Sequence, residues 1–370
     1  MKPVIMYGQD RVRDILQSAF ENGKLAHAYL FLGPEGTGKT AAALGLALMI
    51  QCESHVFGGC GECGPCARLL NHESPDVMFV QPEPNRPKSM KQDVYRDIIR
   101  ERILNKLSHP YNPVRFTPEL TTQPLITVDQ IRAMKKKAFL KVAGSGMRIY
   151  IVSQADTMNV SAANSLLKLL EEPPDRTIII LTSNRQEGLL ETVVSRCQVV
   201  KFAPMTDREV EDALAAEKEI APDHAALLAA MAEGSIARVL DLADSDFTAK
   251  REQSIAYVRH SLLGRFDKVA ESEHGAALVK DRALAREVLE FLVVWFRDML
   301  LVKMNLADRV ANKDRISVLR DMVESFPGVD PDRAMHEVYQ AIDYIGKNVY
   351  LPLVVYSLSC KLYVLVKHEG

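Results

Sequence analysis

The chain has 370 residues, which is long for one ordinary domain, so we expect two or three domains that each bury their own core. Lysine and arginine number 46 against 48 aspartates and glutamates, and the resulting net charge of −2 excludes a globally basic nucleic-acid-binding protein. Any contact with DNA must therefore be local or shared with partner proteins.

The two ends of the sequence bear on its location. Met1 to Asp10 has no apolar core of the kind that a secretory signal needs, which favours a cytoplasmic protein with reduced thiols and no disulfides. Val349 to Val366 has the minimum length of a membrane span, but Lys361 and two serines interrupt it. A tail anchor is the alternative to our interpretation, a buried C-terminal helix entered through Pro352, and we expect no membrane partner.

An alternation of helical and strand patterns fills the first half of the chain. Apolar residues from Val12 to Phe20 recur with helical spacing, and this helix is expected to end at Asn22-Gly23. Helical patterns separate the strands that follow, so we expect an α/β fold with a parallel sheet covered on both faces. The short apolar runs that indicate strands are Ala28–Leu32, Val77–Val80, Ile149–Val152, Ile178–Leu181 and Val199–Phe202.

Two regions depart from this alternation. Between Pro82 and Pro124, prolines flank a charged piece at Asp93–Leu107 with helical character, and we interpret residues 82–124 as an insertion of unknown role. Beyond Pro204 the strand patterns end and alanine- and leucine-rich helical spacing continues to the C-terminus. We predict a first domain at residues 1–204, a small helical unit at 205–246 and a larger helical domain at 247–370.

A glycine-rich loop follows the first strand and precedes an apolar helix, Ala41–Ile50. It reads Gly33, Pro34, Glu35, Gly36, Thr37, Gly38, Lys39 and Thr40. The run fits G-x-x-x-x-G-K-[ST], in which backbone N–H groups and the helix N-terminus surround phosphate oxygens. Lys39 then reaches the terminal phosphates and Thr40 holds Mg²⁺. The loop predicts a site for ATP or ADP with Mg²⁺; a glycine-rich helix cap is the structural alternative.

Four cysteines cluster after this helix in the spacing C-x7-C-x2-C-x2-C: Cys52, Cys60, Cys63 and Cys66. Glycines between them allow tight turns that bring thiolates to one metal, so we predict a four-cysteine Zn²⁺ site in residues 52–66. Because sulfur fills every tetrahedral position, the metal should be structural; a redox or unliganded cluster is the alternative. Cys197 and Cys360 lie elsewhere and are expected to pack as small apolar residues.

Phosphate-loop ATPases hold Mg²⁺ with an acidic residue at the end of a neighbouring strand. The run ending at Val152 continues with Ser153 and Gln154, neither of which is acidic. Asp156 comes later, where the chain has turned, and either reaches the metal or caps a helix or turn ahead of the helix through Ser161 to Leu170. Hydrolysis by this chain alone is therefore doubtful.

Several stretches together resemble the bacterial DNA polymerase III clamp-loader subunits, which belong to the AAA+ class. The resemblance runs from about Tyr7 to Leu242 and implies an AAA+ phosphate-loop domain, a small helical lid and a C-terminal helical collar-like domain. The matching stretches are Tyr7-Gly8-Gln9, His27–Phe31, the phosphate loop, the zinc cysteines, Asn164–Pro174 and Ser195-Arg196-Cys197.

The resemblance also implies roles for single residues. Arg196 matches an arginine that projects into the neighbouring subunit's ATP site, where it stabilises charge on the transferred phosphoryl group; a surface or salt-bridged arginine is the alternative. Asn184 falls where the family places its first sensor near the γ-phosphate, although capping of a loop explains it equally. In the second sensor the hydrolysing gamma/tau subunits carry arginine where this chain has Ala237, and Arg238 comes one position late.

These departures select a role. The hydrolysing gamma/tau subunits also carry Asp-Glu where this chain has Ser153 and Gln154. Loss of that acidic pair and of the second-sensor arginine, with Arg196 retained, resembles the delta-prime subunit, a stator that completes a neighbour's ATPase site. The expected partners are gamma/tau-like and delta-like subunits in a hetero-oligomer, and through it the sliding clamp and primer-template DNA. The main rival is an ATP-hydrolysing gamma/tau-type motor subunit, and a more distant one is a phosphate-loop kinase or phosphotransferase.

One short basic run has two interpretations. Lys135, Lys136 and Lys137, with Arg132, lie on an expected helix after Thr127-Val128-Asp129. A basic helix face could contact DNA phosphates, whereas a solvated face that keeps the helix soluble is the more ordinary reading.

Overall fold

The computed structural model describes residues 3–112, 120, 122–139, 146–243, 246–271 and 273–367. The chain forms two compact units, one of Met1–Ala213 with Gly234–Arg238 and one of Leu214–Glu233 with Val239–Gly370. The three-part division at residues 204 and 246 stays a prediction.

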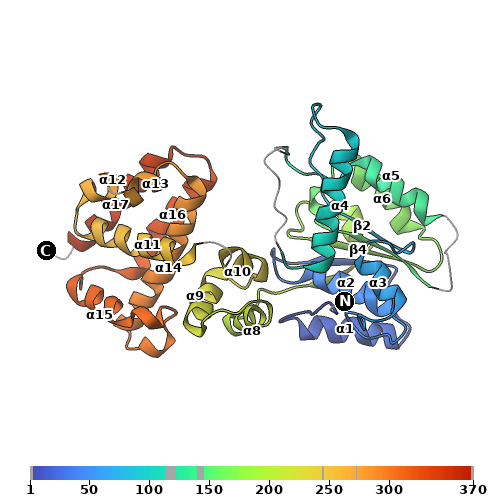
Figure 1. Ribbon diagram of the computed structural model, residues 1–370, viewed down its shortest axis with the longest axis horizontal. Helices are drawn as coiled ribbons and strands as arrows, with labels where there is room; N and C mark the ends of the chain where they lie inside the picture. Colours follow the sequence, from blue (N-terminus) through green and yellow to red (C-terminus); the bar gives the residue numbers. More distant parts are fainter. Residues whose placement is uncertain are drawn as a thin grey trace. The chain divides into compact units, whose positions relative to one another are not determined.

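A five-stranded sheet forms the centre of the first unit, and every strand expected from the sequence is present (Figure 1). All of its neighbouring strands are parallel, in the order β2-β3-β4-β1-β5. In the register, Leu30 of β1 pairs with Leu181 of β4 on one side and Val199 of β5 on the other. The strands are β1 (Ala28–Leu32), β2 (Val77–Val80), β3 (Arg148–Val152), β4 (Thr177–Ser183) and β5 (Gln198–Lys201). The α/β fold class is confirmed.

Helices cover both faces of this sheet, because parallel strands need crossover connections. On one face, α5 and α6 share a core with Leu30, Tyr150 and Leu181. On the other face, α2 packs against β3 and β4. The described helices of this unit are α1 (Asp10–Glu21), α2 (Lys39–Gln51), α3 (Gly64–Leu70), α4 (Gln92–Ser108), α5 (Val128–Ala138), η1 (Ala155–Thr157), α6 (Val160–Glu171) and α7 (Glu191–Val194).

Helix α2 is buried along most of its length, from Lys39 to Ile50. Its alanines and leucines leave no polar stripe, so it is a core helix rather than an amphipathic surface helix. It begins directly after Gly38 of the phosphate loop and its C-cap is Cys52. A single rigid helix therefore joins the phosphate loop to the cysteine cluster.

The second unit is helical throughout its described residues. Helix α14 lies at its centre and packs against α11, α15 and α16. The single tryptophan of the sequence, Trp295, is buried in α14, and its indole N–H lies 3.2 Å from the sulfur of Met322. Wholly within this unit lie α9 (Pro222–Ala232), α11 (Phe247–Leu262), α12 (Phe266–Glu271), α13 (Glu273–Leu278), α14 (Arg282–Lys303), η2 (Ala307–Arg309), η3 (Lys313–Arg315), α15 (Ile316–Ser325), α16 (Pro331–Gly346) and α17 (Leu351–Lys367). Helices α8 (Asp207–Glu217) and α10 (Ile236–Ala243) contain the junctions between the units.

The C-terminal segment forms α17, which packs against α11 and α16 through residues such as Leu358 and Leu362. Among the described residues, no helix combines the length and the apolar character that crossing a membrane requires. One expectation for this helix is wrong. Cys360 is exposed on α17 instead of packing as a small apolar residue, because it lies on the face opposite to the buried leucines.

Candidate functional site

The phosphate loop connects β1 to α2 at the carboxyl edge of the sheet. Gly36 adopts a φ of +78°, and a Cβ there would lie 1.9 Å from the Ser235 hydroxyl oxygen, so only glycine fits. The Gly36 carbonyl accepts a hydrogen bond from the Ile236 N–H at 3.1 Å. The segment Gly234–Arg238 thus closes directly over the loop within the first unit.

The Lys39 ammonium group turns back on its own loop. It donates to the Gly33 and Pro34 carbonyls at 2.6 and 2.5 Å, and Thr37 donates to the same Pro34 carbonyl at 2.9 Å. Burial, with a smaller contribution from the charge of nearby Lys106, lowers the pKa of Lys39 to about 8 against the opposing charges of Glu35 and Asp156. The charge of the buried Lys39 ammonium group is therefore only partly compensated by its surroundings.

A pocket of about 50 Å³ opens above the loop, room for a few water molecules in this conformation. It brings together residues from widely separated segments of the first unit: Glu35, Gly36, Gly38, Lys39, Thr40, Gln81, Pro82, Lys106, Pro110, Tyr111, Ser153, Gln154, Thr182, Asn184 and Ala237. Most of the predicted loop residues and Asn184 thus line one cavity, while Gly33, Pro34 and Thr37 hold the loop beneath it. The roles assigned to these residues stay predictions.

The wall of the pocket at the end of β3 carries no acid. Ser153 and Gln154 line it, whereas Asp156 lies in the η1 turn, accepts a hydrogen bond from the Asn184 N–H at 3.5 Å and pairs with Arg185 at 3.8 Å. Asp156 is thus a turn residue that braces the ends of β3 and β4. It does not cap the following helix, because Asn159 caps α6 by accepting from the Ala162 N–H.

The opposite wall comes from the insertion, and the sequence pattern did not reveal it. Ile99, Ile103 and Leu107 form a buried stripe that holds α4 against the domain, and Lys106, next to the stripe, reaches the pocket. Tyr111 is also buried; its hydroxyl accepts a hydrogen bond from the Tyr7 N–H at 2.9 Å. The stripe was the available signal for a buried face, but it does not indicate what that face covers. Residues 113–119 and 121 of the insertion lie outside the described residues.

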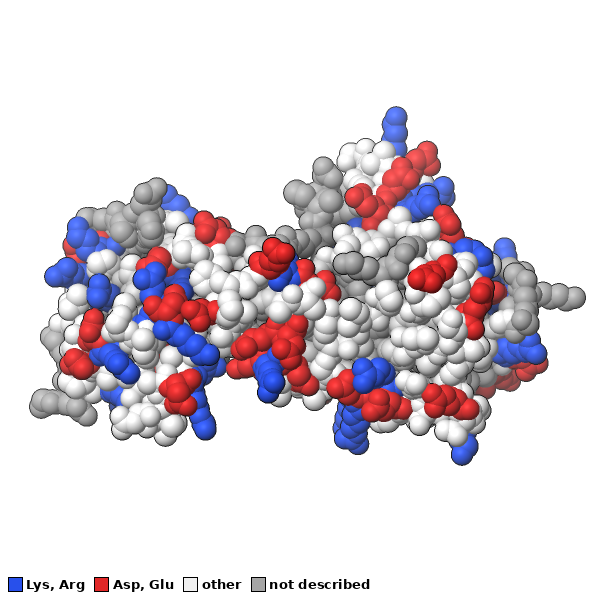
Figure 2. Space-filling model, turned by 60° about the horizontal axis from the view of Figure 1, so that its bottom comes forward, with Lys and Arg blue, Asp and Glu red and all other residues white. Residues whose placement is uncertain are grey.

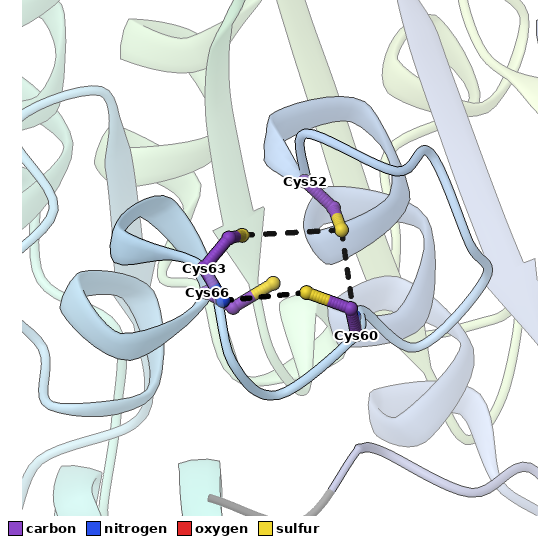
Figure 3. Close-up of side chains that lie close together, drawn as sticks. All are labelled: Cys52, Cys60, Cys63 and Cys66. Atoms are coloured by element: carbon purple, nitrogen blue, oxygen red, sulfur yellow. Dashed lines mark hydrogen bonds between the residues drawn. The ribbon is translucent and has the colours of Figure 1, made fainter.

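The four clustered cysteines point toward one another between the end of α2 and the start of α3 (Figure 3). All four sulfur atoms lie within 4.8 Å of one another, a spacing that suits one tetrahedral metal with metal–sulfur bonds of about 2.3 Å. The Cys60 N–H donates to the Cys52 sulfur at 3.4 Å and the Cys63 N–H to the Cys60 sulfur at 3.3 Å. Although burial opposes ionisation, backbone hydrogen bonds from Cys60, Ser54 and Val56 lower the pKa of Cys52 to about 6. The cluster is therefore able to hold a metal ion.

Comparison with known proteins decides the family. A model of the family described as DNA polymerase III, delta subunit, matches residues 8–206, which include the phosphate loop, the cysteines and Arg196. The chain belongs to this family.

Two relatives within DNA polymerase III illustrate its position in the family. The chain is 30% identical over 309 residues to DNA polymerase III subunit delta' of Bacillus subtilis (strain 168), covering 83% of this chain and 81% of the relative. It is 25% identical over 366 residues to the tau subunit of the same organism, covering 92% of this chain but only 56% of tau. Among solved structures, a gamma-subunit-related protein of Thermotoga maritima aligns over 95% of this chain and 99% of that chain, at 17% identity and a TM-score of 0.43.

Arg196 of this DNA polymerase III family member lies just after α7 and is not among the residues that line the pocket above the loop. Its guanidinium group pairs with Glu171 at 2.8 Å and donates to the Thr192 carbonyl at 2.9 Å. More than a third of the side chain is exposed, at 36%. The salt-bridged, surface-accessible arginine is thus observed, and its action on another subunit stays a prediction.

The basic run on α5 is solvated at Lys136 and Lys137, and Arg132 pairs with Asp129 at 3.3 Å. Thr127 and Gln130 form a capping box that starts this helix, with the three lysines in its last turn, where a helix dipole favours cations. On the face shown in Figure 2, basic and acidic side chains are interspersed. These features fit a solvated helix face, and contact with DNA phosphates stays a prediction.

Proposed function

We propose that this chain is a clamp-loader subunit of the delta-prime type, a stator that completes the ATPase site of a neighbouring subunit. The observation that carries the proposal is an intact phosphate loop facing a wall without carboxylates, formed by Ser153 and Gln154. Ala237 lines the same pocket where a motor subunit would place its second-sensor arginine. Without an acidic residue to help Thr40 hold Mg²⁺ and to polarise water, the loop holds nucleotide and does not turn it over.

In this proposal the catalytic contribution of the chain is Arg196. An arginine supplied in trans stabilises negative charge that develops on the transferred phosphoryl group. Glu171 keeps the guanidinium oriented by an ion pair between partly exposed groups, which costs little to exchange for a phosphate. The partners would be gamma/tau-like ATPase subunits and a delta-like subunit, and through the assembly the sliding clamp and primed DNA.

The cofactors of the proposed stator are Zn²⁺ at the four cysteines and ATP or ADP, with or without Mg²⁺, at the phosphate loop. The sulfur geometry supports zinc in a closed structural site, where no ligand position remains for substrate. Lys39 and the N–H and hydroxyl groups of the loop are the donors that support a phosphate ligand.

A gamma/tau-type motor is the second candidate, favoured by Lys39, Thr40 and the similarity to the tau subunit of Bacillus subtilis. ATP turnover by the purified chain separates the two candidates. A motor hydrolyses ATP with Mg²⁺ and loses this activity with Lys39→Ala, whereas a stator shows no such hydrolysis. The phosphotransferase alternative has no comparable support, since the chain belongs to a DNA polymerase III family.

The decisive test reconstitutes the chain with gamma/tau and delta subunits and measures DNA-stimulated hydrolysis. Arg196→Ala should leave assembly intact and lower the rate of the dependent site by roughly a thousandfold, the scale of an arginine supplied in trans. Glu171→Gln is the matched control, because it removes the ion pair and keeps the arginine. An unchanged rate with Arg196→Ala, or an equal loss with Glu171→Gln, would contradict the assignment.

A further inference from the structure

The insertion carries a second lysine to the phosphate pocket. Helix α4 ends at Ser108, and Lys106 in its last turn lines the same cavity as Lys39 and Thr40. The Lys106 ammonium group donates to the Asn112 carbonyl at 2.8 Å, which fixes the end of the helix and the turn after it. The buried stripe of α4 holds this helix end in place, so the position of Lys106 is built into the fold.

The two lysines share one electrostatic environment. Burial lowers the pKa of each lysine, and the positive charge of Lys106 also lowers the pKa of Lys39. Within the described part of the chain, neither ammonium group forms an ion pair with a carboxylate; their partners are the carbonyls of Gly33, Pro34 and Asn112. The nearest acidic influence on Lys106 is Glu35, which is exposed to solvent. Glu35 is the one carboxylate among the described residues that line the pocket, and as an exposed group it balances the two ammonium charges only in part.

The pocket wall at the end of β3 explains why a second ammonium group would help to bind phosphate. Most phosphate-loop sites neutralise phosphate charge with Mg²⁺ held by an acidic residue on the neighbouring strand. Here Ser153 and Gln154 occupy that edge, and Asp156 is engaged with Arg185 and the Asn184 N–H. Positive charge in this pocket must come from side chains.

The geometry points to Lys106 as a second phosphate-binding lysine, which lets the site bind a nucleoside di- or triphosphate without a divalent metal. This inference rests on the nucleotide-holding part of the proposed function. It also gives the insertion a role: α4 delivers the charge that a metal would otherwise provide.

The test is calorimetric titration of the full chain with ATP and with ADP, in buffer freed of Mg²⁺ by a chelating resin before the protein is added, and in MgCl₂. EDTA is left out because it would compete for zinc at the cysteine cluster. Wild type should bind without Mg²⁺ within about threefold of its affinity in Mg²⁺. Lys106→Met should weaken binding about tenfold or more without Mg²⁺, the usual scale for a charge-assisted hydrogen bond, and Lys106→Arg should restore most of the loss. Lys136→Met, an exposed lysine on α5, is the matched control and should bind as wild type. Circular dichroism and metal content verify that each variant is folded.

Each outcome decides a separate question. Equal nucleotide affinity of wild type and Lys106→Met would overturn the role of Lys106. Tighter binding by Lys106→Met would also overturn it, because the turn that Lys106 fixes after α4 would then block the pocket. Binding that appears only with Mg²⁺ would overturn metal independence. If neither nucleotide binds the wild type at all, the nucleotide-holding reading fails together with the inference, while the Arg196 test of the stator role stands apart.

Discussion

The cysteine cluster and the phosphate pocket lie at the two ends of helix α2, and they are built in opposite ways. The cluster takes all four sulfurs from residues 52–66 and closes on itself. The pocket gathers side chains from the loop, the insertion, three strand ends and the segment around Ala237. A closed local site can stabilise a fold but offers no place for a substrate, whereas an assembled pocket can bind a ligand but depends on every segment that forms it.

The two sites are also connected mechanically. Helix α3, which carries Cys66, packs against α2 and against α4. The cysteine cluster therefore supports both Lys39, through α2, and Lys106, through α3 and α4. Removing the support should weaken the pocket, while damage to the pocket should leave the cluster intact.

The largest expected effect comes from breaking the cluster. Cys63→Ser should abolish stoichiometric zinc and destabilise the first unit by several kcal/mol, since metal binding supplies folding free energy to such sites. Nucleotide affinity should fall with it. Elemental analysis, scanning calorimetry and nucleotide titration measure the three effects. The exposed Cys360→Ser is the control and should retain the metal; a Cys63→Ser protein with full metal content would argue against the site.

A smaller loss is expected at the contact between the loop and the segment Gly234–Arg238. Gly36→Ala adds a Cβ 1.9 Å from the Ser235 hydroxyl at a φ of +78°, so we expect a loss of about 3 kcal/mol and weaker nucleotide binding with zinc retained. Gly23→Ala shares a positive φ of +63° but meets nothing within 4 Å, and should cost only about 1 kcal/mol.

Denaturant titration compares the free energies of unfolding of the two glycine variants. Ser235→Ala separates the backbone strain at Gly36 from the steric clash with the Ser235 hydroxyl. In a double-mutant cycle with Gly36→Ala, removal of the hydroxyl should recover part of the loss. Equal costs at Gly36 and Gly23 would mean that the contact with Ser235 does not constrain the loop.

The smallest effect is a dependence on pH. Lys39 and Lys106 both have a pKa near 8, so between pH 7 and pH 9 both lose most of their positive charge. Bound phosphate favours the protonated amines and raises their pKa, and affinity is therefore retained below pH 8 and lost as the pH rises through it, by about tenfold or more at pH 9. Titrations of ADP at several pH values in Mg²⁺-free buffer measure this slope. Lys106→Met should flatten it, and a slope that Lys106→Met leaves unchanged would exclude that lysine from the effect.

Short sequence patterns predicted the features that depend on residues close together in the chain. The phosphate loop could be read because its function depends on backbone conformation over adjacent residues, and the cysteines because a metal requires thiolates at short spacings. The five strands followed from short apolar runs, since both faces of a parallel sheet are buried.

Features that depend on tertiary packing could not be read in the same way. Lys106 and Tyr111 reach the pocket only because Ile99, Ile103 and Leu107 pack α4 against the domain. The contact of Gly36 with Ser235 joins positions far apart in the sequence. The burial of a single cysteine on an apolar helix depends on which face it occupies, and this is where the expectation for Cys360 failed.

The position of Trp295 has a spectroscopic consequence. As the only tryptophan of the sequence, it places the intrinsic tryptophan emission of the protein within the helical second unit, beside a methionine sulfur. Its fluorescence will follow melting of that unit and stay silent about the phosphate loop and the cysteines. The ring of Tyr111 lies tilted against that of Tyr7, with centroids 5.5 Å apart, and a tryptophan in place of Tyr111 would give the pocket above the phosphate loop an optical signal of its own.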